Sequence, residues 1–322
     1  MKNTLMRNML RSAVFLLLLA LMLSLLSVVF RPKNNNHDAG MYYIMAHGFL
    51  AERERSIDVL ILGDSESYSS YSPLEMWDAG GFTSYVSAIG GETLDLSYSY
   101  LLEATAHQQP RLVIIEGLTA VRTFSLNHAI YEQSALCFPI MITHDNWKSL
   151  TPKRILAPIV YTHREANKGF KPSTETQAYD GSDYMTPTDE VLSLSLLNRI
   201  YLMRILHYCD SRNIPVLLVA TPSPVNWNYA KHSILQQFAE QNGVPFLDLN
   251  LSLDELGLDH QTDWQDGGDH LNLYGATKLS RYMAAYLAEQ YDLPDHRKDS
   301  DYENWSNALN KYRETYPDLS PS

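Results

Sequence analysis

From residue 57 onward, short runs of strand-forming residues alternate with longer stretches of helical periodicity. The apolar runs predict buried strands at 57–62, 85–89, 111–115, 215–220 and 245–249. The periodic stretches predict helices at 94–107, 233–242 and 273–290. A further helix is predicted to begin at a cap formed by residues 186–189 (TPTD). This alternation indicates βαβ crossovers and an α/β fold with a parallel sheet covered on both faces.

The N-terminus carries an uncharged apolar run at residues 12–30, preceded by Lys2, Arg7 and Arg11. A helix needs about 20 apolar residues to cross a bilayer, whereas a cleavable signal peptide has a shorter apolar region followed by small residues. The run therefore predicts one uncleaved signal-anchor helix, with a cleaved signal as the alternative. The basic residues before it favour a cytosolic N-terminus, so we expect a single-pass cell-membrane protein whose C-terminal part lies outside the cytoplasm.

The chain is expected to divide into four parts. Residues 1–31 form a cytosolic stub and the anchor helix, 32–55 a polar tether or stalk, 56–291 the main domain, and 292–322 a C-terminal extension. Residues 119–185 interrupt the strand–helix alternation. We expect them to form an insertion beside the site rather than a second domain.

Composition excludes two classes of protein. The formal net charge of −12, from 25 basic and 37 acidic residues, argues against the basic face that nucleic-acid binding requires. Two cysteines are too few for a disulfide scaffold or a thiolate metal site. We therefore look for chemistry in the loops at the carboxyl ends of the predicted strands, where parallel sheets bind their ligands.

A serine follows the first predicted strand, in the sequence GDSE at residues 63–66. At the carboxyl edge of a parallel sheet, Ser65 can present its hydroxyl and its backbone N–H to one reacting carbonyl. Gly90 and Gly91 follow the second strand, and because they lack a Cβ they let the backbone approach a ligand closely. They can supply a second N–H for an oxyanion hole. The alternative at both places is an ordinary turn.

A serine hydroxyl needs a base to take its proton. The best candidate is His270, in the sequence DGGDHLN at residues 266–272, just before the last predicted helix. Asp266 or Asp269 could orient its ring and complete a Ser, Asp, His triad. Acids and histidines are dense between residues 254 and 270, but their spacings match no metal motif, so we expect neither a metal nor a cofactor.

Three segments together resemble the SGNH/GDSL hydrolase superfamily: GDSE after the first strand, IGGETL after the second, and DHLNLYGATKLS before the last helix. The resemblance implies a flavodoxin-like three-layer α/β/α sandwich, preceded here by one transmembrane helix. It also implies that Ser65 is the nucleophile, Gly91 an oxyanion donor beside the Ser65 N–H, and His270 the base.

Two positions depart from that family's pattern. Gly267 stands where the family's acid lies, so Asp266 is the preferred acid and Asp269 the alternative. The sequence IEGL at residues 115–118 replaces the motif that carries the family's asparagine oxyanion donor. The expected hole therefore has two donors.

Residues 221–223 (TPS) and 246–250 (FLDLN), with Pro73 and Trp77, resemble the membrane-anchored exported bacterial branch of the family. That branch is similar to the D-alanyl transfer protein of teichoic acid synthesis and to polysaccharide O-acetylation proteins.

This resemblance implies an extracytoplasmic esterase or O-acyltransferase that acts on a cell-envelope polysaccharide or teichoic acid, with a membrane-bound O-acyltransferase as a candidate partner. His163 and Arg164, in the expected insertion, are predicted to bind substrate, with a structural salt bridge as the alternative. A non-catalytic envelope protein that binds glycan or such a partner remains the alternative function.

Overall fold

The computed structural model describes residues 2–319, and the backbone alone at residues 2, 3 and 149. Residue 1 of the expected stub and residues 320–322 of the expected extension lie outside the described residues. The chain divides into two compact units. Unit 1 comprises Met1–Ile44 and Leu126–His163, and unit 2 comprises Met45–Ser125 and Arg164–Ser322.

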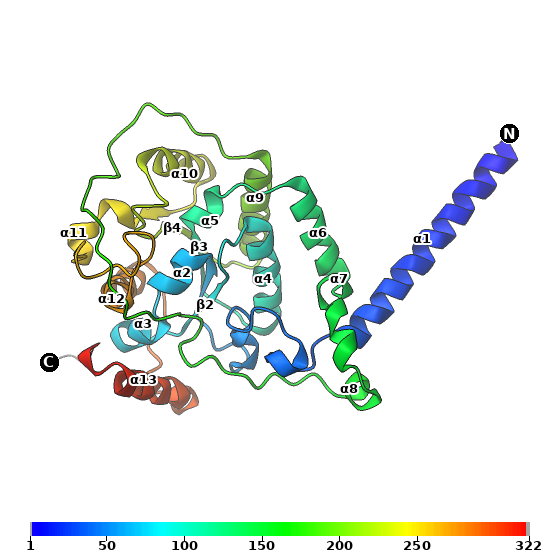
Figure 1. Ribbon diagram of the computed structural model, residues 1–322, viewed down its shortest axis with the longest axis horizontal. Helices are drawn as coiled ribbons and strands as arrows, with labels where there is room; N and C mark the ends of the chain where they lie inside the picture. The colour runs from blue at the N-terminus through cyan, green and yellow to red at the C-terminus, as the bar shows by residue number, and fades with distance from the viewer. Residues whose placement is uncertain (1, 320–322) are drawn as a thin grey trace. The chain divides into compact units, whose positions relative to one another are not determined.

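Unit 2 is built on a five-stranded parallel sheet in the order β2-β1-β3-β4-β5 (Figure 1). The strands are β1 Val59–Gly63, β2 Ser84–Ala88, β3 Leu112–Glu116, β4 Val216–Ala220 and β5 Phe246–Asp248. All five predicted strands are confirmed, with ends shifted by up to two residues. The order is that of flavodoxin-like sheets, which confirms the expected α/β class.

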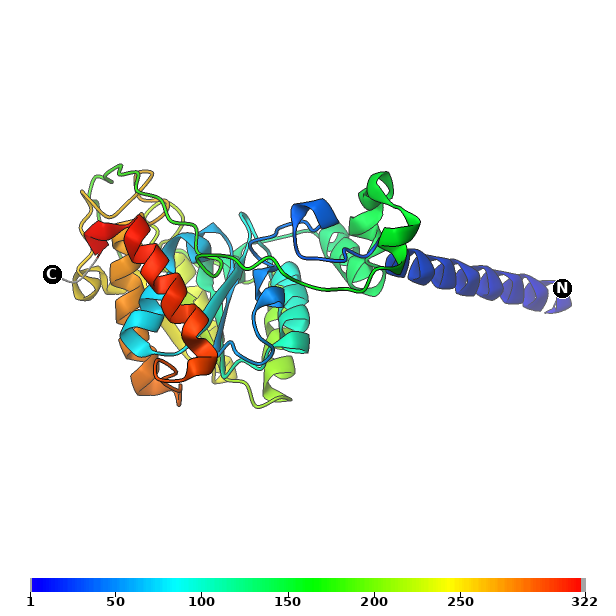
Figure 2. The ribbon, with the colours of Figure 1, turned by 90° about the horizontal axis from the view of Figure 1, so that it is seen from below.

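Helices cover both faces of this sheet (Figures 1 and 2). On one side, α3 (Pro73–Gly80) packs against α12 (Leu273–Gln290), and on the other α4 (Leu94–His107) packs against α9 (Leu196–Asp210). Val59 and Ile61 of β1 share a buried core with Leu279 and Met283 of α12. Since side chains alternate along a strand, Leu60 and Leu62, also buried, face the other layer.

The helix predictions are confirmed except at one N-cap. α4 and α12 have the predicted bounds, and α10 (Tyr229–Asn242) begins four residues early. The cap predicted at 186–189 is wrong, because α9 begins at Leu196 and the Ser195 hydroxyl accepts the N–H of Asn198 at 3.1 Å. Residues 186–189 lie in irregular chain, where Thr186 donates to Asp183 at 3.0 Å. Short polar side chains suit such turns as well as they suit helix caps.

Shorter helices complete unit 2. They are α2 Ser65–Ser70, α5 Gly117–Val121, α11 Leu253–Leu256, α13 Glu303–Thr315 and the 3-10 helices η2 Gly48–Ala51, η4 Leu249–Leu251, η5 Ser300–Tyr302 and η6 Pro317–Leu319. Within the expected C-terminal extension, Trp305 and Tyr312 of α13 are buried against Leu74 and Trp77 of α3. Within the expected stalk, Phe49 is fully buried in unit 2. Both segments thus add to the core of unit 2.

Unit 1 contains the N-terminal helix α1 (Lys2–Phe30), of which Thr4–Phe30 is long and apolar enough to cross a membrane. Its other elements are η1 His37–Ala39, α6 Leu126–Cys137, α7 Ile140–Thr143, η3 His144–Ser149 and α8 Pro152–Leu156. We expected residues 119–185 to form one insertion. In the structure, residues 126–163 belong to unit 1, and residues 164–185 belong to unit 2.

Candidate active site

The first strand turns sharply into α2, and Ser65 is the first residue of that helix. The turn needs glycine at position 63, since a Cβ there would lie 2.2 Å from Ser67 Oγ and 2.5 Å from Glu116 Cβ. Asp64 caps the helix by accepting the N–H of Glu66 at 3.2 Å. Ser65 is half-buried at the carboxyl end of β1, the edge of the sheet at which the sequence placed the candidate nucleophile.

His270 lies in the loop before α12, where the carboxylate of Asp266 makes two hydrogen bonds to it. Asp266 Oδ2 is 2.6 Å from His270 Nδ1, and Asp266 Oδ1 accepts the His270 backbone N–H at 2.7 Å. Because a carboxylate only accepts, this contact assigns the ring proton to Nδ1. His270 Nε2 is then the acceptor, and it is buried with no hydrogen-bond partner.

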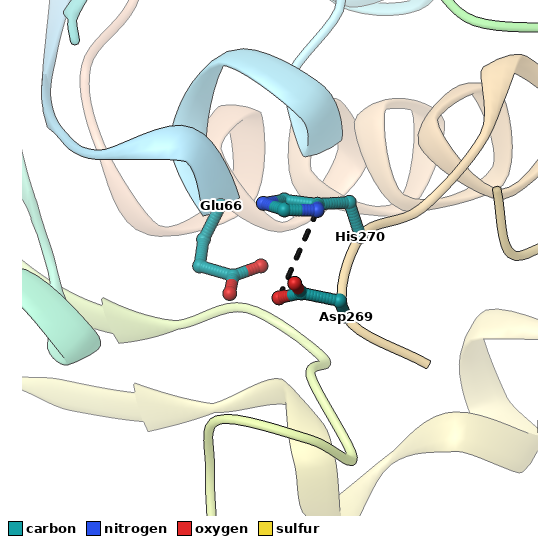
Figure 3. A group of neighbouring side chains, drawn as sticks. All are labelled: Glu66, Asp269 and His270. Carbon is teal, nitrogen blue, oxygen red and sulfur yellow. Dashed lines mark ion pairs between the residues drawn. The ribbon is translucent and has the colours of Figure 1, made fainter. Parts of the chain in front are cut away.

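The loop's glycines explain the unusual spacing of acid and base. Gly267 and Gly268 have φ of +78° and +101°, in the region that favours glycine. The chain therefore folds back, and Asp266, four residues before His270, reaches the ring. Asp269 Oδ1 is 3.7 Å from the same Nδ1 (Figure 3). Of the two candidate acids, Asp266 makes the hydrogen bond.

The chain neighbours of Ser65 on both sides lie near His270. The ligand atoms of Glu66, Asp269 and His270 lie within 4.8 Å of one another, and Figure 3 shows these side chains gathered at the start of α2. His270 also interacts electrostatically with the carboxylate of Asp64. Since Nε2 has no partner, the Ser65–His270 hydrogen bond is not formed in this state. In enzymes without bound substrate this bond is often long and tightens on binding.

The Gly90–Gly91 turn lies near the same helix. A Cβ on Gly90 would lie 3.6 Å from the phenol oxygen of Tyr68. The pKa of Tyr68 is raised by burial and by Asp64, and an interaction with the Ser65 hydroxyl opposes the rise. Gly91 has φ of +69° and open space where a Cβ would stand. The Gly90–Gly91 turn, which is expected to carry an oxyanion donor, and Ser65 therefore both lie near the phenol of Tyr68.

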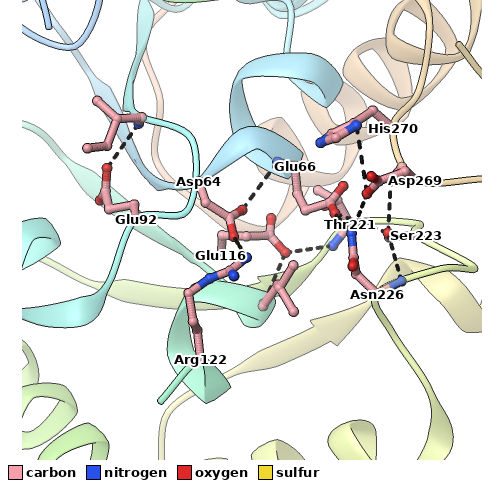
Figure 4. Close-up of polar contacts among 12 residues, drawn as sticks. Asp64, Glu66, Glu92, Glu116, Arg122, Thr221, Ser223, Asn226, Asp269 and His270 are labelled. Atoms are coloured by element: carbon pink, nitrogen blue, oxygen red, sulfur yellow. Dashed lines mark hydrogen bonds and ion pairs between the residues drawn. The ribbon is translucent and has the colours of Figure 1, made fainter. Parts of the chain in front are cut away.

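Four buried carboxyl groups lie at this edge of the sheet: Asp64, Glu66, Glu92 and Glu116 (Figure 4). Asp64 pairs with Arg122 at 2.6 Å. Burial raises the pKa of all four, that of Glu66 and Glu92 well above the usual range and that of Glu116 to about 8. Desolvation favours the uncharged form of a carboxyl group, so burial favours the neutral form of Glu66, Glu92 and Glu116.

Glu66 joins three loops by hydrogen bonds. Its Oε1 accepts from Ser223 Oγ at 3.0 Å and from Asn226 Nδ2 at 2.8 Å. Ser223 Oγ is also 2.9 Å from the backbone oxygen of Asp269, and Asn226 bonds the Asp269 carboxylate (Figure 4). The nucleophile turn, the loop after β4 and the His270 loop are therefore tied together.

Comparison with protein-family models finds no match, and neither does comparison with curated proteins. Among solved structures, the chain is similar to a GDSL-like lipase from Bacteroides thetaiotaomicron, with 10% identity, a TM-score of 0.38, and coverage of 76% of this chain and 95% of that one. It is also similar to a lipase/acylhydrolase from Enterococcus faecalis, with 13% identity, a TM-score of 0.39, and coverage of 74% and 99%.

These names match the superfamily that the sequence motifs resemble. Neither is of the D-alanyl transfer branch, which stays a prediction.

Glu66, Asp269 and His270 also have the geometry to hold a metal ion. Their facing atoms are largely used by the protein, because Asn226 bonds both carboxylates and Asp266 bonds His270 Nδ1. Glu66 Oε2 and His270 Nε2 are the buried atoms of this group without partners.

The two residues predicted to bind substrate lie in different units. His163 belongs to unit 1, where its backbone pairs with the side chain of Asn35 at 2.8 and 3.0 Å. Arg164 belongs to unit 2 and donates from Nε to the backbone oxygen of Ala51 at 3.2 Å. Substrate binding by His163 and Arg164 stays a prediction.

The second half of the expected insertion does border the site. The backbone N–H of Lys171 donates to the backbone carbonyl oxygen of Tyr68 at 2.8 Å, and the backbone N–H of Gly267 donates to the carbonyl oxygen of Gln177 at 3.0 Å. The segment between Lys171 and Gln177 therefore runs from α2 to the His270 loop.

Sequence reasoning missed the roles of Glu66, Ser223 and Asn226. The TPS motif at 221–223 carries a family resemblance but no signal for this hydrogen-bonding role. Nothing in the sequence marks Glu66 as buried, since glutamate is almost never fully buried without partners.

Proposed function

We propose that unit 2 carries out serine-dependent acyl-ester chemistry, with Ser65 as nucleophile, His270 as general base and Asp266 as the residue that orients the base. One observation carries the proposal. Asp266 holds His270 Nδ1 at 2.6 Å while Nε2 is buried without a partner, beside the two residues that flank Ser65. A fixed tautomer with a free Nε2 is what a base for a serine hydroxyl requires.

In the first half-reaction, Ser65 Oγ bonds to the carbonyl carbon of an ester or thioester while His270 Nε2 takes the hydroxyl proton. The carbonyl π electrons move to the oxygen, where the N–H groups of Ser65 and Gly91 donate to the oxyanion. The intermediate then expels the alcohol or thiol, which takes the proton from His270. Acyl-Ser65 remains, and Asp266 stabilises the imidazolium formed on the way.

In the second half-reaction, an acceptor hydroxyl attacks acyl-Ser65 while His270 Nε2 takes its proton. Collapse returns that proton to Ser65 Oγ and releases the acylated acceptor. Water as acceptor gives an esterase, and a hydroxyl of a cell-envelope polysaccharide or teichoic acid gives an O-acyltransferase. An anchor helix at Thr4–Phe30 would hold this chemistry at the outer membrane face, near lipid-linked acyl donors.

The buried carboxyl groups near Ser65 are compatible with an oxyanion because burial favours their neutral, protonated forms. An ionised carboxylate beside the site would oppose the developing negative charge. Burial raises the pKa of Glu66, Glu92 and Glu116 and so favours their neutral forms. Arg122 neutralises Asp64 at 2.6 Å.

A second function, non-catalytic binding of glycan or of a membrane acyltransferase, is favoured by one observation. Glu116 occupies the place where the resembled family has its asparagine donor, and its Oε1 is used by the Thr221 N–H at 3.1 Å. The site then offers two oxyanion donors rather than three.

Ester hydrolysis by the full-length protein in detergent separates the two functions. We expect p-nitrophenyl acetate turnover in the wild type and its loss, by at least about 10³-fold, in Ser65→Ala. Ser67→Ala is the matched control, since Ser67 lies on the same helix and its hydroxyl is buried without a partner. No turnover by the folded wild type, or equal turnover in Ser65→Ala, favours the binding protein.

A further inference from the structure

Unit 1 displays an unusual number of exposed apolar side chains in residues 126–160. Six of the larger ones are Leu126, Ile130, Met141, Ile142, Trp147 and Leu156. Trp147 is 62% exposed and Leu156 is 85% exposed. Concentrated exposed apolar side chains are typical of a protein or membrane interaction site.

This segment is fastened to the last turns of α1. Ile140, the first residue of α7, donates its N–H to Ser27 Oγ at 3.1 Å. Asn146 Nδ2 donates to the Phe30 carbonyl oxygen at 3.0 Å. Ser27 lies three residues before the end of α1, which at 1.5 Å per residue is about 4.5 Å along the helix axis.

Because of these bonds, α7 and η3 lie at the same level as the C-terminal end of α1. If Thr4–Phe30 crosses a bilayer, that end lies at the boundary between hydrocarbon and headgroups. The exposed side chains of Met141, Ile142 and Trp147 then lie at the depth where interfacial residues are found.

The composition of the segment fits this depth. Tryptophan is enriched at membrane–water interfaces, and Trp147 is followed by the exposed cations Lys148 and Lys153. Residues 126–163 hold three basic and two acidic residues, in a chain whose net charge is −12. Leu126 and Ile130 stand four residues apart on α6, so they share one helix face.

We propose that residues 126–160 form an interfacial platform that rests on the phospholipid bilayer spanned by α1. The apolar side chains enter the headgroup region, and the lysines face lipid phosphates. This inference rests on the anchoring part of the proposed function, and it is independent of the chemistry of Ser65. The platform would fix the exit of α1 in the membrane.

Trp147 provides a direct probe. The chain has five tryptophans, and the other four, all in unit 2, are buried: Trp77, Trp227, Trp264 and Trp305. The full chain is reconstituted into phosphatidylcholine vesicles whose acyl chains carry bromine, a contact quencher of indole fluorescence. We expect bromine to remove up to about a fifth of the emission, since one tryptophan in five enters the interface.

Variants assign this quenching. It should vanish in Trp147→Phe and persist in Trp227→Phe. Ile142→Glu should lower it several-fold by disfavouring apolar insertion, whereas Val225→Glu, at a 62% exposed apolar residue of unit 2, should leave it unchanged. Equal emission in brominated and ordinary vesicles overturns the proposal.

Two further outcomes are distinguishable. Protein that alkaline carbonate extracts from the vesicles shows that α1 does not anchor, so the anchoring part of the proposed function fails as well. Anchored protein whose residue 147 is unquenched by lipid, but cross-links to a protein in native membranes, shows a protein partner in place of lipid and overturns the platform alone.

Discussion

The decisive contact of the candidate site is that between Asp266 and His270, and its removal has a predictable size. In Asp266→Asn the amide oxygen can still accept the His270 backbone N–H, as Asp266 Oδ1 does at 2.7 Å in the wild type. The amide NH2 then faces Nδ1, which carries its proton in the wild type at 2.6 Å from the carboxylate. The ring is forced to the tautomer with its proton on Nε2, which cannot accept a proton from Ser65.

A wrong tautomer of this kind costs about 10⁴-fold in turnover, or roughly 5 kcal/mol of transition-state stabilisation. Asp269→Asn is the matched control, because Asp269 Oδ1 is 3.7 Å from Nδ1 and is bonded by Asn226. We expect that variant to lose less than about tenfold, since a contact beyond 3.5 Å is not a hydrogen bond.

The assay is kcat/KM for p-nitrophenyl acetate with the full-length protein in detergent, alongside thermal unfolding to show that each variant is folded. If Asp269→Asn is the more damaging change, the orienting acid is Asp269 and the loop geometry does not set the catalytic pairing. If both variants keep wild-type turnover, neither carboxylate sets the tautomer of the base, and the assigned role of Asp266 is wrong.

Two predictions concern the buried acids. Burial raises the pKa of Glu66 and so favours its neutral form, and Glu66→Gln, which can still accept from Ser223 and Asn226, should keep the free energy of unfolding in urea within about 1 kcal/mol. Glu66→Ala leaves these two donors only their contacts to Asp269 and should lose about 1–3 kcal/mol; equal losses in the two variants would contradict a neutral Glu66 that acts as an acceptor. The pKa of Glu116 is raised to about 8 from 4.5, so its contribution to stability is full below pH 4.5 and is lost as pH rises toward 8, by up to roughly 5 kcal/mol. Glu116→Gln should therefore flatten the fall of unfolding free energy between pH 5 and 8 by up to about 1.4 kcal/mol per pH unit, and an unchanged slope contradicts the raised pKa.

The sequence predicts the sheet well because most of its strands are short apolar runs, flanked by polar, Gly or Pro residues, that alternate with longer helical stretches. The cap predicted at residues 186–189 fails because Thr and Asp side chains stabilise turns as well as helix starts, and Ser195 serves α9 instead. The division of residues 119–185 between two units depends on tertiary contacts, which local patterns do not encode.

The candidate site is foreseen in part for similar reasons. Ser65 and His270 stand out because polar residues follow apolar strands and precede the last helix. The sequence favours Asp266 over Asp269 as the orienting acid but does not settle the choice, because the contact of Asp266 with His270 depends on the positive φ of Gly267 and Gly268. The tie from Glu66 to the loop after β4 spans about 160 residues of chain and depends on burial, so it becomes visible only in the folded structure.

The central claim is that Ser65 is an activated nucleophile, and covalent labelling tests it most directly. The full-length protein in detergent is treated with a fluorophosphonate, which reacts with activated serines, and the modified residue is mapped by mass spectrometry. The account predicts a single adduct on Ser65, retained in Ser67→Ala and lost in His270→Ala. An adduct on another serine, or a folded wild-type protein that stays unlabelled while a known serine hydrolase in the same sample is modified, would contradict it.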